Sequence, residues 1–433
     1  MNIGSFTAAY AVWNNILKGD LIMKKVLALI LALVLTLGAT SALADIMLCQ
    51  NKVEIDGALK EYAEGYAART GVNVKINTIG GSVSYPVGLK AEFAGGSEPD
   101  LFVIEGPSDY ETYKDRMVDL SDEEWVKNTN SAYVVDGKVV GFPVSMEGYG
   151  LAYNKSILDK AGIDPATLTN RGALQAAFEK LDGMKADLGL DMVVSMVAGT
   201  APGMTWVTGL HNFNVYLTVG LPQGDTSIID KVLAGEVDEA RFHEYCQYVA
   251  LLFQYSSEDM LLNGTQDSQL AAFANGKAAF YHQGNWMDPS FADLTYDFEI
   301  GYAPHAFLPE DTDGIIAFTP SWYVVNKNGN VEEAKAFLNA LVNTEEGQNY
   351  MVVKAGMVPA YSNVTIQPAG PLSVALMQWT AQNKTYGAEQ YKLPDGFGMG
   401  TLGQIYELLA SKTIDVDTFE QMMKDAIATI PTL

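Results

Sequence analysis

Tryptophans are the side chains of this sequence best suited to hold a ligand through a flat apolar surface. The chain holds six of them, and one closes the segment FANGKAAFYHQGNW at positions 273–286. An indole offers an apolar face and a polar N–H edge, so Trp286 could be a core residue or a platform for a ligand. The preceding Gly284 would then clear room for the ligand face. The local sequence allows both interpretations.

Two carboxylates at turns could do polar chemistry. Glu105 follows the apolar run 100–104, and Glu147 stands in the non-helical segment 143–149. An unpaired carboxylate is costly to bury, so each could accept a hydrogen bond from a ligand hydroxyl or ammonium group, or could be a solvated turn residue. As an alternative, the pair could be the acid and base of a secreted glycoside hydrolase, although nothing places them across a scissile bond.

Metal or cofactor chemistry finds little support in the sequence. The histidines show no close ligand spacing and the two cysteines lie far apart, so we expect no metal, no cofactor and no disulfide framework. The residues concerned are His211, His243, His282, His305, Cys49 and Cys246.

Alternating strands and helices would position these side chains. The pattern predicts strands over 45–49, 72–76 and 100–104, with helices over 54–69 and 85–95. Strand, helix and strand in succession indicate a right-handed βαβ unit and a parallel sheet.

Ligands of open α/β sheets lie beyond the carboxyl ends of the strands. Asn51, Gly81, Ser82 and Glu105 follow such ends, so we expect their loops to be candidates for binding. Turn chemistry alone would also explain glycine and asparagine there.

A second α/β region begins near residue 151. Helical patterns cover 155–161, 173–187, 238–255 and 263–275, and the segment 273–286 closes the region with a turn at Gly276 and a short strand. We find no internal repeat and no low-complexity linker.

The N-terminus has the residue pattern of an export signal. Lys24 and Lys25 precede the apolar run 26–37 and the small-residue site 42–44, which is typical of a secretory signal peptide over 23–44, cleaved after Ala44. We expect Met23 to be the true start and 1–22 to be an upstream extension. The net charge of −25 at pH 7 repels nucleic acid and anionic lipid, so we expect neither as a partner.

Several motifs in the same order along the chain resemble those of one family. They are FANGKAA (273–279) with GNW (284–286), YGLAYNK (149–155), AGID (161–164), PSWYVVN (320–326), EAKAFL (333–338), TEEGQ (344–348) and GMVP (356–359). This set is similar to that of extracellular solute-binding proteins of the family 1 type, the sugar-binding subunits of ABC importers that include maltose-binding protein.

The resemblance implies a periplasmic-binding-protein-like α/β fold of two lobes around a hinged cleft. One lobe would be 45–152 with 305–358, and the other 153–303 with 359–433. Such a protein would be a monomer in the periplasm or at the cell surface, would not be an enzyme, and would deliver its ligand to the permease subunits.

The resemblance also implies a sugar or oligosaccharide as ligand, held between aromatic faces and polar side chains. A polyamine remains the alternative, since it would also suit aromatic residues and carboxylates. The expected ligand-binding residues are Trp286, Trp322, Glu147, Trp206, Glu105, Asn51, Gly81, Ser82, Ser321, Tyr149 and Tyr361.

Overall fold

The computed structural model describes residues 45–80, 84–292 and 294–432. The expected extension 1–22, the expected signal peptide 23–44 and the candidate residues Gly81 and Ser82 lie outside the described residues. Within those ranges, no helix is long and apolar enough to cross a membrane.

A six-stranded sheet forms the centre of the first lobe, in the order β2-β1-β3-β12-β5-β4. Strand β1 runs parallel to β2 and β3, whereas β12 is antiparallel to β3 and β5. The predicted βαβ unit is thereby confirmed. The strands are β1 (Ile46–Gln50), β2 (Val74–Thr78), β3 (Leu101–Ile104), β4 (Tyr133–Val135), β5 (Lys138–Pro143) and β12 (Trp322–Val325).

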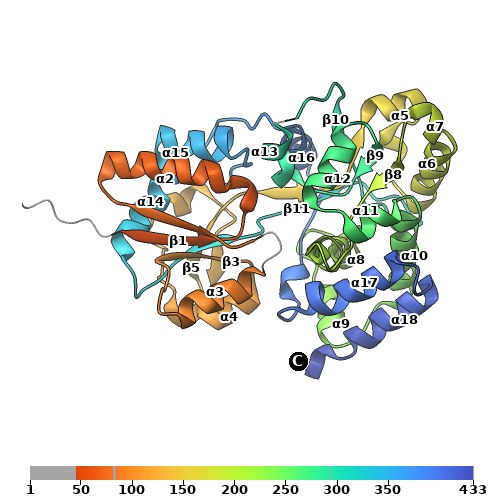
Figure 1. The fold of residues 1–433 in the computed structure, drawn as a ribbon. Coiled ribbons are helices and arrows are strands. Elements are labelled where there is room, and N and C mark those ends of the chain that lie inside the picture. The colour runs from red at the N-terminus through yellow and green to blue at the C-terminus, as the bar shows by residue number, and fades with distance from the viewer. Residues whose placement is uncertain (1–44, 81–83, 293, 433) are drawn as a thin grey trace, which may run out of the picture. The chain divides into compact units, whose positions relative to one another are not determined.

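Helices cover both faces of this sheet. In Figure 1, α2 and α15 lie on one side of the sheet and α3 and α4 on the other. Every residue of β3 is buried, as expected for a strand covered on both faces. The helices are α2 (Asp56–Thr70), α3 (Tyr85–Ala94), α4 (Pro107–Tyr113), α14 (Val331–Asn343) and α15 (Glu345–Asn349).

The second lobe is built on a four-stranded sheet in the order β10-β7-β9-β8. Its strands are β7 (Leu151–Asn154), β8 (Met192–Ser195), β9 (Ala278–Tyr281) and β10 (Ile300–Ala303). Strand β9 follows a turn at Gly276, whose φ of +67° suits glycine. The turn predicted there is confirmed.

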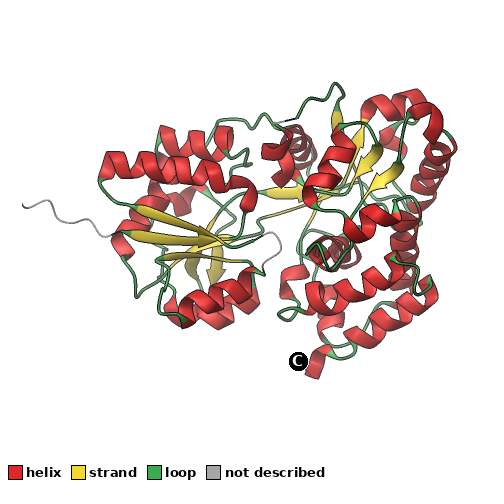
Figure 2. Cartoon of the chain, in the orientation of Figure 1, coloured by secondary structure: helices red, strands yellow, loops and turns green. Residues whose placement is uncertain are grey.

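Helices make up most of the second lobe (Figure 2). Those packed on or near its sheet are α5 (Lys155–Ala161), α6 (Arg171–Gly183), α7 (Lys185–Leu188), α11 (Glu258–Asn263), α12 (Gln266–Ala274), α13 (Asp288–Phe291) and α16 (Pro371–Ala381). The others are α8 (Phe213–Thr218), α9 (Ser227–Leu233), α10 (Glu239–Gln254), α17 (Gly403–Ala410) and α18 (Val416–Ile427).

A three-stranded sheet, β13-β11-β6, lies where the chain crosses between the lobes. Strand β6 (Glu147–Tyr149) leads out of β5 into β7, and β11 (Ile315–Phe318) leads back into β12. The two pair antiparallel, with Phe318 opposite Glu147. The third strand is β13 (Thr385–Tyr386). Two antiparallel crossings lie side by side here, as in the hinge of a two-lobed protein.

Two separate hydrophobic cores correspond to the two lobes, so the predicted α/β class is confirmed. Their membership suggests lobe bounds that differ from those expected from the sequence. Phe307 packs in the second core and Leu308 accepts a hydrogen bond from Arg171 at 2.9 Å, whereas Tyr361 and Val364 pack in the first core. We therefore propose that the chain returns to the first lobe after about residue 312, not at 305, and leaves it after 364, not at 358.

Candidate ligand-binding site

A cavity of ≈ 190 Å³ lies beyond the carboxyl ends of β1 and β3, and residues of both lobes line it. Its position is the one expected for a ligand of an open α/β sheet. The first lobe supplies Asn51, Lys52, Glu54, Glu105, Pro320 and Ser321. The second lobe supplies Trp206, Leu210, His211, Gln266, Trp286, Tyr391 and Met399.

Two indoles form an aromatic wall of this cavity. The rings of Trp206 and Trp286 lie 6.2 Å apart at 67°, and the His211 ring lies 4.8 Å from Trp286. Trp206 is half-buried, while Trp286 is only 8% exposed. A flat apolar surface of this kind suits the C–H face of a ligand ring.

The position of Trp286 has a local cause. Strand β9 ends at Tyr281, and Trp286 sits in a single 3-10 turn, Asn285–Met287. A Cβ added to Gly284 would lie 2.1 Å from this indole. The expectation that Gly284 clears room for a ligand is therefore wrong, because the room is filled by the tryptophan itself. The indole Nε1 donates to Gln283 Oε1 at 2.9 Å, which fixes the ring.

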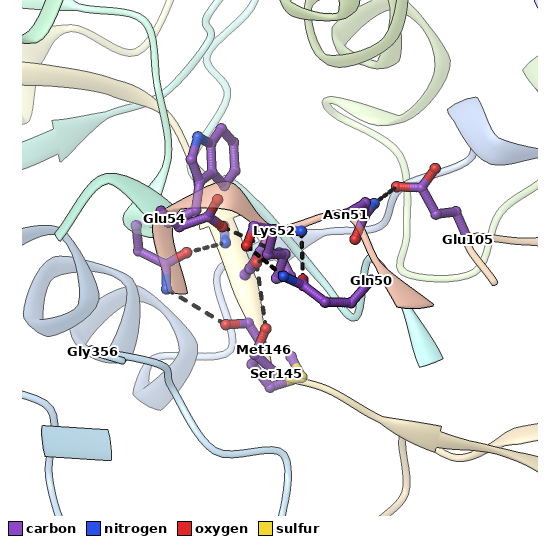
Figure 3. Close-up of polar contacts among 12 residues, drawn as sticks. Gln50, Asn51, Lys52, Glu54, Glu105, Ser145, Met146 and Gly356 are labelled. Atoms are coloured by element: carbon purple, nitrogen blue, oxygen red, sulfur yellow. Dashed lines mark hydrogen bonds and ion pairs between the residues drawn. The ribbon is translucent and has the colours of Figure 1, made fainter. Parts of the chain in front are cut away.

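A buried charged cluster forms the opposite side. Lys52 Nζ pairs closely with Glu147 Oε1 and lies 3.8 Å from Glu54 Oε1 (Figure 3). The three side chains are only 9–12% exposed. Ser145 Oγ donates to Glu147 Oε1 at 3.3 Å. Glu147 is thus not the unpaired carboxylate that the sequence suggested.

The cluster changes the proton affinity of its members. Burial acts to lower the pKa of Lys52, but the charges of Glu147 and Glu54 outweigh it and the pKa is raised. Burial raises the pKa of Glu54, and the nearby Lys52 charge only partly offsets this. Lys52 therefore stays charged and holds two carboxylates at the edge of the cavity.

Glu105 reaches the same cavity from the end of β3. Its Oε1 accepts a hydrogen bond from Asn51 Nδ2 at 2.8 Å. Burial, and then the negative charge of Asp109, raises the pKa of Glu105 to about 8. This carboxyl is consequently protonated at neutral pH.

The structure brings six of the described candidates to the cavity, namely Asn51, Glu105, Glu147, Trp206, Trp286 and Ser321. The remaining three pack elsewhere. Trp322 Nε1 donates to the Ser131 carbonyl at 2.6 Å, Tyr149 to that of His211 at 2.9 Å, and Tyr361 to that of Pro143 at 2.9 Å. Tyr149 and Tyr361 are buried and Trp322 is half-buried, and their hydrogen bonds to the backbone are typical of packing residues.

Sequence reasoning missed several of the lining residues, among them Lys52, Glu54 and Tyr391. Lys52 and Glu54 directly follow the end of β1, so extending the strand-end argument by a few residues would have found them. Tyr391 belongs to a short 3-10 turn, Gln390–Lys392, and carries no sequence signal for its place in the cavity.

Three histidines are buried around Tyr149, and one of them, His211, also lines the cavity. The ring centroids of His211 and His305 lie 5.0 and 5.7 Å from that of Tyr149, and His282 lies 4.8 Å from His305. Tyr248 Oη bonds His305 Nδ1 at 2.6 Å. Among the described residues, no group of three His, Cys, Asp or Glu side chains could hold a metal ion. The three rings act as buried polar packing.

We expect these three of the chain's four histidines to stay neutral in mildly acidic solution. Burial lowers the pKa of His211 to about 3 and of His282 to about 4, and that of His305 well below its ordinary value. Unfolded histidines titrate near 6.5. The stability that comes from burying these rings in their neutral form is therefore present above pH 6.5 and is lost as the pH falls through the folded pKa values. NMR of the ring nuclei at pH 5 should show three neutral imidazoles, and a midpoint above about 5.5 for two of them would contradict the prediction.

An exposed contact joins the two lobes beside the cavity. Asp395 Oδ2 pairs with Lys90 Nζ at 2.9 Å, and its Oδ1 accepts from Ser108 Oγ at 3.2 Å. Lys90 and Ser108 belong to the first lobe and Asp395 to the second. The contact would hold the lobes together over a bound ligand.

Asp395→Asn should therefore weaken ligand affinity by about two- to fivefold, since an exposed pair contributes about 0.2–1 kcal/mol. Isothermal titration calorimetry at low salt measures this change in affinity. Asp159→Asn, which removes an equally exposed pair with Lys155 inside one lobe, serves as the control and should leave affinity unchanged. Equal effects of the two variants would exclude an inter-lobe role.

Known proteins resemble this chain over most of its length. A family model described as bacterial extracellular solute-binding protein matches residues 61–372. An uncharacterized ABC transporter extracellular-binding protein of Pyrococcus horikoshii is 21% identical over 401 residues, covering 87% of this chain and 85% of that protein. A maltooligosaccharide ABC transporter solute-binding lipoprotein of Streptococcus pneumoniae is 24% identical over 315 residues, covering 70% of this chain and 69% of that protein.

Among solved structures, a chitin oligosaccharide binding protein matches with a TM-score of 0.73 at 19% identity, covering 91% of this chain and 100% of that one. At this identity the match establishes the fold, which has the two lobes expected from the sequence. The family model spans well over half of the residues, so the resemblance read from the motifs is confirmed. The chain belongs to the family of bacterial extracellular solute-binding proteins.

Proposed function

We propose that this protein captures a sugar or oligosaccharide in the cavity between its lobes and delivers it to the permease of an ABC importer. One observation carries the proposal. The tryptophan pair of the second lobe, Trp206 and Trp286, lines the same cavity as the strand-end residues Asn51 and Glu105 of the first lobe and Glu147 of the crossing strand β6.

This arrangement matches the chemistry of a carbohydrate. The C–H face of a sugar ring can stack on an indole, and its hydroxyls can donate to carboxylates and amides around it. Because the two kinds of contact come from different lobes, both exist only when the lobes meet. Ligand binding would then shift the population toward the closed form that a permease recognises.

The relatives support the sugar class. One is a maltooligosaccharide-binding lipoprotein of an ABC transporter, and another binds chitin oligosaccharide. We further propose that the protein is a monomer, works outside the cytoplasm after cleavage at Ala44, and binds no nucleic acid, in keeping with its net charge of −25.

Thermal-shift screening of mono- and oligosaccharides would test the proposal, with spermidine as the competing class. A ligand at 100 times its Kd stabilises the folded protein by about 2.7 kcal/mol. Stabilisation by a sugar, with one-to-one binding and no products after long incubation, is the expected result. A shift with spermidine alone would favour the polyamine alternative, and sugar hydrolysis would favour an enzyme that uses Glu105 and Glu147.

A further inference from the structure

The polar side of the cavity carries more negative than positive groups. Glu54, Glu105 and Glu147 line it together with a single lysine. Lys52 forms ion pairs with Glu54 and Glu147 and none with Glu105. Within the described ranges, no lysine, arginine or histidine forms an ion pair with Glu105.

The surroundings of Glu105 add acceptors rather than cations. The backbone N–H of Glu105 donates to the buried Asp109 Oδ2 at 2.9 Å. Asn51 Nδ2 donates to the Glu105 carboxyl, as Figure 3 shows. Burial, and then the charge of Asp109, raises the pKa of Glu105, and the nearby Lys52 charge offsets this only in part, so the carboxyl holds its proton.

Two polar atoms of the lining have no partner in the described part of the chain. Ser321 is 1% exposed, and its Oγ forms no hydrogen bond. Asn51 Oδ1 is also buried without a partner, and this atom can only accept. Buried polar atoms are normally satisfied, so Asn51 Oδ1 points to a ligand that brings a hydrogen-bond donor to this end of the cavity, and Ser321 Oγ points to a polar ligand group of either kind.

We infer that the sugar is one that carries a free amino group, with its ammonium seated between the carboxyl of Glu105 and the side-chain oxygen of Asn51. The inference rests on the proposed function and narrows it to a cationic sugar. An ammonium group offers three donors, and Glu105 and the unpartnered Oδ1 supply acceptors for it. The sugar ring would lie against Trp206 and Trp286, whose faces also attract cations.

Placing an ammonium group beside Glu105 fixes how many protons are released on binding. Glu105 enters as a neutral carboxyl, and the ligand enters as an ammonium ion. On binding, the Glu105 O–H bond breaks, its proton passes to solvent, and a carboxylate paired with ammonium remains. One proton is released for each ligand bound at pH 6, where a primary ammonium keeps its proton.

Calorimetry with matched sugars tests this inference. The glucosamine trimer and its fully N-acetylated counterpart share the same sugar backbone, and the acetyl groups of the second remove the charge from its nitrogens. We expect the amino form to bind about tenfold tighter or more, because charge-assisted bonds are the stronger kind. Titrations at pH 6 in two buffers of different ionisation enthalpy should show release of about one proton.

Glu105→Gln should abolish the preference and the proton release, since glutamine has a similar shape but no ionisable group. Glu111→Gln, on the exposed side of α4 and paired with Lys114, is the matched control and should retain both. The proton release of the unmodified protein tests the inference even if the Glu105 variant folds poorly.

The outcomes separate this inference from the proposed function. Tight binding of neutral sugars without proton release, or weaker binding of the amino form, would overturn the inference and leave the sugar-binding function intact. Binding of spermidine and of no sugar would overturn both. Failure of every amino sugar to bind would also overturn the inference.

Discussion

Lys52→Met should lower the free energy of unfolding by about 3–5 kcal/mol, because it removes one partner of a buried charge cluster and leaves the others unpaired. Methionine keeps the apolar stem of lysine and so preserves most of the packing. Glu54 and Glu147 would then be buried with no positive charge between them. Denaturant unfolding at pH 7, followed by circular dichroism, measures the loss.

The pH dependence of this loss follows from the sign of the shift. Without the offsetting charge of Lys52, the pKa of the Glu54 carboxyl should rise further in the folded state above its unfolded value near 4.3. The cost of burying a charged Glu54 is then absent below pH 4.3 and grows as the pH rises through the raised pKa of this group. The variant should therefore approach the unmodified protein in stability near pH 4.5.

Two further variants make the test specific. Lys52→Met with Glu147→Gln removes both partners of the closest pair and should restore much of the lost stability. Lys60→Met removes an exposed pair with Asp56 on α2 and should cost about 1 kcal/mol or less. If Lys52→Met costs no more than Lys60→Met, the cluster does not support the fold.

The sequence was a good guide wherever one local rule decides the structure. Strand β3 is a short apolar run bounded by polar residues, and Glu105 directly follows it. Parallel strands bring their carboxyl ends to one edge, so Asn51 and Glu105 meet although they are 54 residues apart. Topology alone therefore predicts their meeting without any knowledge of side-chain packing.

Contacts between distant side chains could not be read in the same way. Lys52 lies in the loop after β1 and Glu147 begins β6, 95 residues away, so no spacing rule pairs them. Residue type was equally uninformative for Trp322, Tyr149 and Tyr361, because an aromatic ring serves a core as well as it serves a cleft. The π-helical turn Val207–Asn212, which carries His211 and precedes α8, has no local sequence signal either.

Trp286 and Trp206 should respond differently to removal, although both line the cavity. Trp286 is 8% exposed, packs on Gly284 and contacts the rings of Tyr149 and His211. Trp286→Ala should therefore cost about 3–5 kcal/mol of stability through the void it leaves, in addition to any loss of affinity. It is both a packing residue and part of the wall.

Trp206 is half-buried, so its truncation separates the two roles. Trp206→Ala should weaken sugar binding by about 1–3 kcal/mol, as expected for an aromatic anchor, while costing clearly less stability than Trp286→Ala. Trp379→Ala is the control, since this half-buried indole donates to the Tyr302 carbonyl and does not line the cavity. Calorimetry with a bound sugar and denaturant unfolding would be measured on all three variants.

A reversed pattern would be informative. If Trp206→Ala leaves the affinity unchanged while Trp379→Ala lowers it, the aromatic wall is not where the sugar lies. If Trp286→Ala loses affinity without losing stability, its ring is held by the ligand rather than by Gly284 and Tyr149. The expected order arises because the ring most deeply inserted in the wall has the most protein contacts to lose, while the more exposed ring has more surface to give to a ligand.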